Sequence, residues 1–136
     1  MSQKLNIIVM NHGEFGTWLI KSAEMIVGEI KDVYAFSLTE GKSIENLIKE
    51  VTETFDTLNG ETVLLTDMYG GTPNNAALVI QQKYQCRLIC GMNLPILLEL
   101  ILIRDRDDVS LDVLIKNCVA AGKKSIESCI SPISSI

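Results

Sequence analysis

Residues 62–84, TVLLTDMYGGTPNNAALVIQQKY, read as a buried strand, a glycine-containing loop and a helix in direct succession. The strand is predicted at 62–66, because its centre is a continuous apolar run of the kind that parallel sheets cover on both faces. The helix is predicted at 73–84, with Thr72 as its N-cap and proline at its first position. A strand–loop–helix unit of this kind is typical of α/β proteins.

The same alternation extends along the chain in both directions. Further strands are predicted at 5–10, 33–38 and 86–90, and further helices at 15–27, 44–58, 93–101 and 111–121. We therefore predict a doubly wound α/β fold with a mainly parallel, four-stranded sheet. The strand order 2-1-3-4 is favoured, because it is the common solution for a small domain that begins with a buried strand. No repeat or linker interrupts the pattern, so residues 1–136 are predicted to form a single domain.

The tail at 123–130 has two interpretations. Polar and apolar residues alternate there, which favours an edge strand with one mostly apolar face. Such a strand, antiparallel and supplied by the same or a neighbouring chain, would cover the free edge of the fourth strand. The alternative is a tail that continues the last helix and leaves a monomer.

The composition excludes several classes of protein. The 136 residues are 47% hydrophobic and 21% charged, which suits a packed core and is inconsistent with disorder. A net charge of -5, without a long cluster of Lys or Arg, argues against nucleic acid as a partner. The N-terminus is too polar for a signal peptide and no apolar run is long enough to span a membrane, so we predict a cytoplasmic protein.

The cysteines are assigned no chemistry. Cys86, Cys90, Cys118 and Cys129 include no Cys-x-x-Cys pair, and the spacing of zinc ligands is absent. We predict neither a metal site nor a cofactor. Cys86 and Cys90 are interpreted as small buried hydrophobic residues in a reducing compartment.

Two loops are expected to carry the function. In the order 2-1-3-4 the first and third strands are neighbours, and ligands bind outside their carboxyl ends. His12, the only histidine, follows the first strand, and Asp67 follows the third. The Asp67 carboxylate can hold one ring nitrogen of His12, fix the tautomer and leave the other nitrogen as a nucleophile. The alternatives are that Asp67 caps a turn or helix and that His12 is a core residue.

The glycines beside His12 and Asp67 are suited to binding an anion. Gly70, Gly71 and Thr72 lead into a predicted helix N-terminus, where main-chain N–H groups bind phosphate. Together with Gly13 they are the candidate phosphate-binding residues, although glycine pairs also serve tight turns without a ligand. A nucleophilic nitrogen, a carboxylate and an anion site describe phosphoryl transfer through a phosphohistidine better than acyl transfer. No ATP-binding P-loop is present, so the phosphoryl group is expected from another protein.

Three ordered segments of the sequence resemble the enzyme IIA components of the mannose/fructose/sorbose family of the bacterial sugar phosphotransferase system. These segments are IIVMNHGEF with KSAEMIVGE, LLTDMYGGTPNNAA, and GMNLPILLE, and the resemblance covers nearly the whole chain. It departs from the family pattern at Tyr69 in place of Phe or Trp, at Thr72 in place of Ser, and at Ile96 in place of Met. None of these departures removes a chemical group that the mechanism needs.

The resemblance implies a phosphotransferase, in which His12 accepts a phosphoryl group from the phosphohistidine of the carrier protein HPr and passes it to a IIB component. It implies that Nε2 is attacked while Nδ1 faces Asp67, and that the membrane components IIC and IID take part indirectly. Because no IIB domain or linker rich in Ala and Pro follows in the sequence, IIB is expected to be a separate chain. It also favours a homodimer formed by strand exchange. The alternatives are a regulatory domain of a transcriptional activator, the phosphocarrier subunit of dihydroxyacetone kinase, and a flavodoxin-like domain that binds a small ligand without catalysis.

Overall fold

A four-stranded sheet forms the centre of the structure, a computed structural model that describes residues 5–132. Its strands are β1 (Leu5–His12), β2 (Val33–Leu38), β3 (Glu61–Thr66) and β4 (Arg87–Cys90). They lie in the order β2-β1-β3-β4, and every pairing between them is parallel. The predicted doubly wound class and the order 2-1-3-4 are confirmed, and β1 and β3 are neighbours at the centre.

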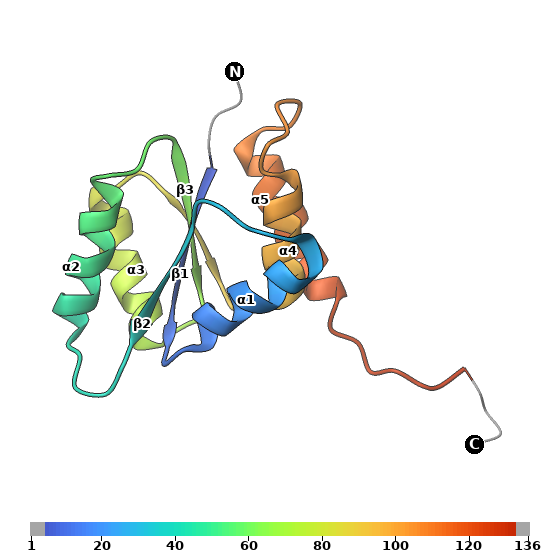
Figure 1. Cartoon of the computed structure of the whole chain (residues 1–136), viewed down its shortest axis with the longest axis horizontal. Helices are drawn as coiled ribbons and strands as arrows, with labels where there is room; N and C mark the ends of the chain where they lie inside the picture. Colours follow the sequence, from blue (N-terminus) through green and yellow to red (C-terminus); the bar gives the residue numbers. More distant parts are fainter. Residues whose placement is uncertain (1–4, 133–136) are drawn as a thin grey trace.

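Helices cover both faces of the sheet (Figure 1). One face carries α2 (Ile44–Phe55) and α3 (Thr72–Lys83), and the other carries α1 (Phe15–Val27), α4 (Leu94–Ile103) and α5 (Leu111–Lys124). Polar side chains start three of these helices, since Ser43, Asn93 and Ser110 each accept a hydrogen bond from the main chain of the first turn.

The central strands are apolar on both faces because each face meets a helical layer. Along β1, Ile7 and Val9 join the core beneath α1, α4 and α5, whereas Ile8 and Met10 join the core beneath α2 and α3. Successive side chains of a strand point to opposite faces, so an uninterrupted apolar run fills both cores at once. This packing places the carboxyl ends of β1 and β3 side by side.

The last helix runs further than the sequence pattern predicts. An end near residue 121 was expected before Gly122, but α5 continues to Lys124. Gly122 is buried, and a Cβ atom there would overlap the side chain of Ile96 on α4. The glycine therefore allows two helices to approach closely and does not end the helix.

The antiparallel strand predicted within 123–130 is absent from the described part of this single chain. Residues 126–132 form neither helix nor strand and lead away from the body of the molecule (Figure 1). A strand needs the edge of another strand for its hydrogen bonds, and this segment pairs with no strand among residues 5–132. Exchange between subunits would require a second chain and stays a prediction.

The cysteines differ in exposure more than expected. All four are free; Cys118 is buried, Cys129 is exposed, and Cys86 and Cys90 are half-buried. The expectation that Cys86 and Cys90 are buried is therefore only partly right, because they lie at or beside the edge strand β4. Burial, assisted by the charge of Glu99, raises the pKa of the Cys118 thiol to about 12, so this group is neutral at physiological pH.

Candidate active site

The structure brings His12 and Asp67 into contact. β1 ends at His12 and β3 ends at Thr66, directly before Asp67, so the two residues leave the sheet from neighbouring strands. Nδ1 of His12 lies 2.7 Å from Oδ2 of Asp67. The main-chain N–H of His12 donates to the same oxygen at 2.8 Å. One carboxylate oxygen thus holds both the ring and the main chain of the histidine.

The side chains of His12 and Asp67 differ in exposure, and this suits them to different chemical roles. The His12 side chain is 47% exposed, whereas that of Asp67 is 9% exposed. A carboxylate at Nδ1 favours the tautomer that carries its proton there, which leaves the lone pair on Nε2. The arrangement presents a nucleophilic nitrogen at the surface and keeps the carboxylate largely away from water.

Gly71 provides the space in which the imidazole lies. It is the N-cap of α3, and a Cβ atom at this position would lie 3.0 Å from Cε1 and 3.7 Å from Nε2 of His12. Gly70 and Gly13 adopt left-handed backbone conformations, with φ of 85° and 57°. The N–H of Gly13 donates to the carbonyl of Leu38 at 2.9 Å. The Gly13 N–H is therefore already bonded within the fold.

Thr72 occupies a different position from the one predicted. It is the first residue of α3 and not the N-cap, because the first helical hydrogen bond runs from the N–H of Asn75 to the carbonyl of Gly71. Among residues 5–132, the Thr72 side chain forms no hydrogen bond. Its hydroxyl therefore remains available beside the start of the helix.

Two hydrogen bonds of buried polar side chains at the site were not predicted from the sequence. Nδ2 of Asn11 donates to the carbonyl of Gly13 at 2.7 Å. Oγ1 of Thr66 donates to Oδ1 of Asn74 at 2.7 Å and ties the end of β3 to the first turn of α3. The available signal was a polar residue directly after the apolar run of each strand, Asn11 after residues 7–10 and Thr66 after residues 63–65.

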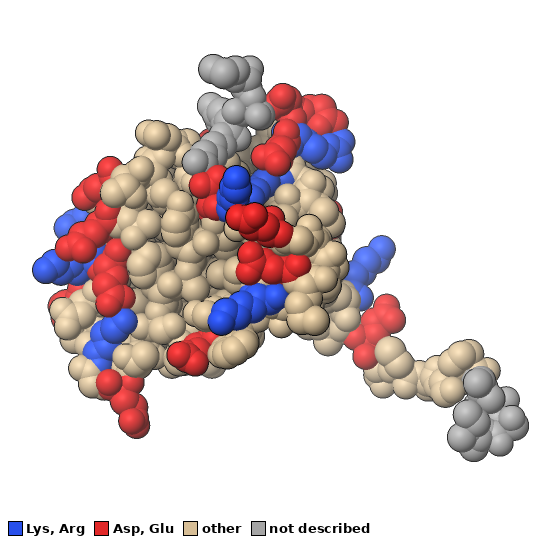
Figure 2. All heavy atoms as spheres, viewed as in Figure 1, with Lys and Arg blue, Asp and Glu red and all other residues tan. Residues whose placement is uncertain are grey.

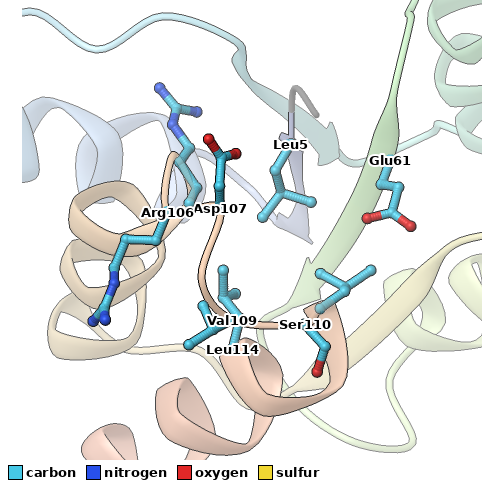
Figure 3. Close-up of a pocket in the computed structure, with 9 residues that line it drawn as sticks. Leu5, Glu61, Arg106, Asp107, Val109, Ser110 and Leu114 are labelled. Carbon is cyan, nitrogen blue, oxygen red and sulfur yellow. The ribbon is translucent and has the colours of Figure 1, made fainter. Parts of the chain in front are cut away.

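The opposite end of the sheet carries a cavity of about 470 Å³ (Figure 3). It is lined by the first residues of two strands, Leu5 and Glu61, and by the charged bend before α5, including Arg106 and Asp107. Its charged groups are of both signs, and Arg106 is paired with Asp108. Acidic and basic side chains also intermingle on the face in Figure 2.

Within residues 5–132, no cluster of three or more His, Cys, Asp or Glu is placed to hold a metal ion. Over the same residues, no helix has the length and apolar character needed to cross a membrane.

Fold and site together define a doubly wound α/β protein that presents a carboxylate-bound histidine at its topological switch point. Residues 6–118 match the family model of the PTS system fructose IIA component. The chain belongs to this family of IIA components of the sugar phosphotransferase system, and the resemblance seen in its sequence is confirmed.

Individual relatives agree with this assignment. The chain is 33% identical over 126 residues to the PTS system mannose-specific EIIAB component of Escherichia coli (strain K12), covering 90% of this chain but only 38% of that protein. It is 31% identical over 128 residues to the PTS system fructose-specific EIIA component of Bacillus subtilis (strain 168), covering 92% and 86% respectively. The crystal structure of phosphotransferase system component EIIA from Streptococcus agalactiae superposes with a TM-score of 0.85 at 25% identity, covering 92% of this chain and 97% of that one.

Proposed function

We propose that the protein is a phosphocarrier of the sugar phosphotransferase system and acts as a phosphotransferase in the cytoplasm. His12 accepts a phosphoryl group from phosphorylated HPr and passes it to a IIB component, through which the membrane components IIC and IID are reached. The observation that carries the proposal is the 2.7 Å contact of Nδ1 with Asp67 at a ring that is 47% exposed. A histidine oriented by a carboxylate and open to solvent suits transfer between two proteins.

The imidazole of His12 is the nucleophile. With the proton on Nδ1, the lone pair of Nε2 attacks phosphorus while the N–P bond of the donor phosphohistidine breaks. The donor imidazole leaves with the electron pair of that bond, and positive charge develops on the His12 ring. Asp67 stabilises this charge through Nδ1–H and keeps the ring oriented. Transfer to IIB repeats the step with His12 as the leaving group.

The phosphoryl oxygens are placed against the start of α3. The first turn of a helix leaves main-chain N–H groups without helical partners, and such groups bind anions. Gly70, Gly71 and Thr72 are the proposed source of these donors, together with the Thr72 hydroxyl. Gly13 has no side chain and a left-handed conformation, which allow the loop to run close to the phosphoryl group.

Proteins are favoured as the donor and acceptor by the surface beside His12. Phe15 and Trp18 begin α1, and Met68 and Tyr69 follow Asp67; all four are large apolar side chains that are exposed. Exposed aromatic and apolar residues are typical of surfaces that contact other proteins. The cavity in Figure 3, by contrast, lies at the far end of the sheet from the histidine.

Incubation with phosphoenolpyruvate, enzyme I and HPr tests this function. We expect one acid-labile phosphoryl group per chain, detected by intact mass, because His12 is the only histidine. His12→Ala should accept none. A modification that survives acid, or one that persists in His12→Ala, would show that the phosphoryl group is carried elsewhere.

A further inference from the structure

Asn11 is a fully buried polar residue in β1, directly before the active-site histidine. Its Nδ2 donates to the carbonyl of Gly13 at 2.7 Å and to the carbonyl of His12 at 3.3 Å. The other half of the amide packs against α1, since a Cβ atom at Gly16 would overlap Oδ1 of Asn11. The side chain is therefore fixed between the histidine loop and the first helix.

The main-chain N–H and carbonyl groups of His12 and Gly13, the histidine loop, all have hydrogen-bond partners. The N–H of His12 donates to Asp67 at 2.8 Å, and the N–H of Gly13 donates to the carbonyl of Leu38 at 2.9 Å. The two carbonyls that remain, those of His12 and Gly13, are the ones that Asn11 binds. No other side chain among residues 5–132 donates to either carbonyl, so this half of the restraint depends on Asn11 alone.

We propose that Asn11 is a positioning residue for phosphoryl transfer at His12. By holding both carbonyls, Asn11 fixes the main chain from which the imidazole projects, and so keeps Nδ1 against Asp67 and Nε2 directed at the incoming phosphoryl group. This inference rests on the proposed function of His12. A small displacement of a reacting group lowers the rate far more than it lowers stability.

Asn6 offers a matched control on the same strand. It is also fully buried, its Nδ2 also donates to a loop carbonyl at 2.7 Å, that of Asn59, and its Oδ1 also lacks a hydrogen-bond partner. It lies at the amino end of β1, away from the histidine. The two asparagines share their burial and hydrogen bonding, and differ in whether they touch the site.

The experiment compares Asn11→Leu with Asn6→Leu, because leucine keeps the branched shape of the asparagine side chain and lacks the donor. Three quantities are measured: thermal unfolding, the rate of phosphoryl transfer from phosphorylated HPr, and the ¹⁵N chemical shifts of the imidazole. The last measurement is unambiguous because the chain has one histidine. Should Asn11→Leu not fold, Asn11→Ser and Asn6→Ser form the second pair.

Both variants should lose stability, but only Asn11→Leu should change the active site. We expect its transfer rate to fall by about tenfold or more. Its imidazole should shift from the tautomer protonated at Nδ1 toward the one protonated at Nε2, which predominates in unrestrained histidine. Asn6→Leu should keep the wild-type rate and tautomer.

Wild-type ¹⁵N shifts and rate in Asn11→Leu, or equal changes in Asn6→Leu, would overturn the positioning role. If the wild-type protein accepts no phosphoryl group, the proposed function is wrong. The ¹⁵N comparison then still decides whether Asn11 orients the imidazole.

Discussion

Asp67 contacts His12 twice, once at the ring and once at the main chain. Asp67→Asn keeps the size of the side chain but removes the charge that stabilises the cationic ring. It also replaces one of the two acceptor oxygens by an NH2 donor, which weakens the control of the tautomer. We expect the fold to remain intact and phosphoryl transfer to slow by about 10²-fold or more, as when other orienting carboxylates are lost. Single-turnover transfer from phosphorylated HPr, measured beside a melting curve, tests this.

The control for Asp67 is an exposed carboxylate with no contact to the site. Asp108 pairs with Arg106 in the charged bend before α5, and this guanidinium lowers the pKa of the Asp108 carboxyl. Asp108→Asn should leave the transfer rate unchanged. A wild-type rate in Asp67→Asn would mean that the carboxylate only anchors the loop.

Gly71 gives a second prediction at the residue scale, because its backbone is extended and tolerates alanine without strain. The methyl group of Gly71→Ala would lie 3.0 Å from Cε1 of His12 and displace the ring. We expect transfer to slow by about tenfold, with a change in unfolding free energy below about 1 kcal/mol. Equal rates for Gly71→Ala and wild type would show that the ring tolerates the displacement.

His12 and Asp67 could be predicted as a pair because the switch-point rule depends only on the order of the strands. Asn11 and Asn74 could not be predicted as buried participants. Their partners are a carbonyl two residues ahead and a hydroxyl on another element, and neither partnership leaves a periodic pattern in the sequence. The N-cap of α3 is Gly71, one residue before the predicted Thr72, for a related reason: the position of the cap depends on where the main chain turns.

At the scale of elements, β3 and α3 are joined by the buried hydrogen bond from Thr66 to Asn74. Thr66→Val has the same shape and leaves the Asn74 oxygen unpaired, so it should lower the unfolding free energy by about 1–3 kcal/mol. Thr66→Ser keeps the hydroxyl and should be milder. In an Asn74→Leu background the Thr66→Val effect should shrink, and denaturant unfolding of the four proteins measures this coupling. An undiminished effect in that background would show that the pair does not act as a unit.

Most elements could be predicted because the central strands are buried on both faces and therefore apolar throughout. The errors fall where a residue's role depends on another element. The helix predicted at 111–121 continues through Gly122, which faces Ile96 on α4 and permits close packing. The alternation in the tail leaves open whether it forms a strand, because a strand also requires an edge with which to pair, and a second chain would have to supply that edge.

At the scale of the whole molecule, the two ends of the sheet differ in character. The carboxyl ends of β1 and β3 carry the histidine and its carboxylate, with exposed Trp18 and Tyr69 nearby in sequence. The amino ends carry a cavity lined by charges of both signs. His12 lies at the carboxyl end of the central strand β1, whereas β4 is an edge strand. An assembly that covers the edge of β4 would therefore leave the histidine accessible to partner proteins.

The free edge of β4 and the alternating tail predict a homodimer formed by strand exchange. Ile126 and Ile130 are exposed in the single chain, 75% and 93%, and pairing with a neighbour's β4 would cover both the tail and the edge. Light scattering should therefore give twice the mass of the 15.0 kDa chain.

A truncation after Ser125, which keeps all of α5, should give a monomer. The full-length variant Ile126→Ser/Ile130→Ser should weaken the dimer, whereas Glu127→Ser, on the other face of the predicted strand, should not. A monomeric wild-type protein, or a dimer that survives the truncation, would contradict exchange of the tail and assign any association to another surface.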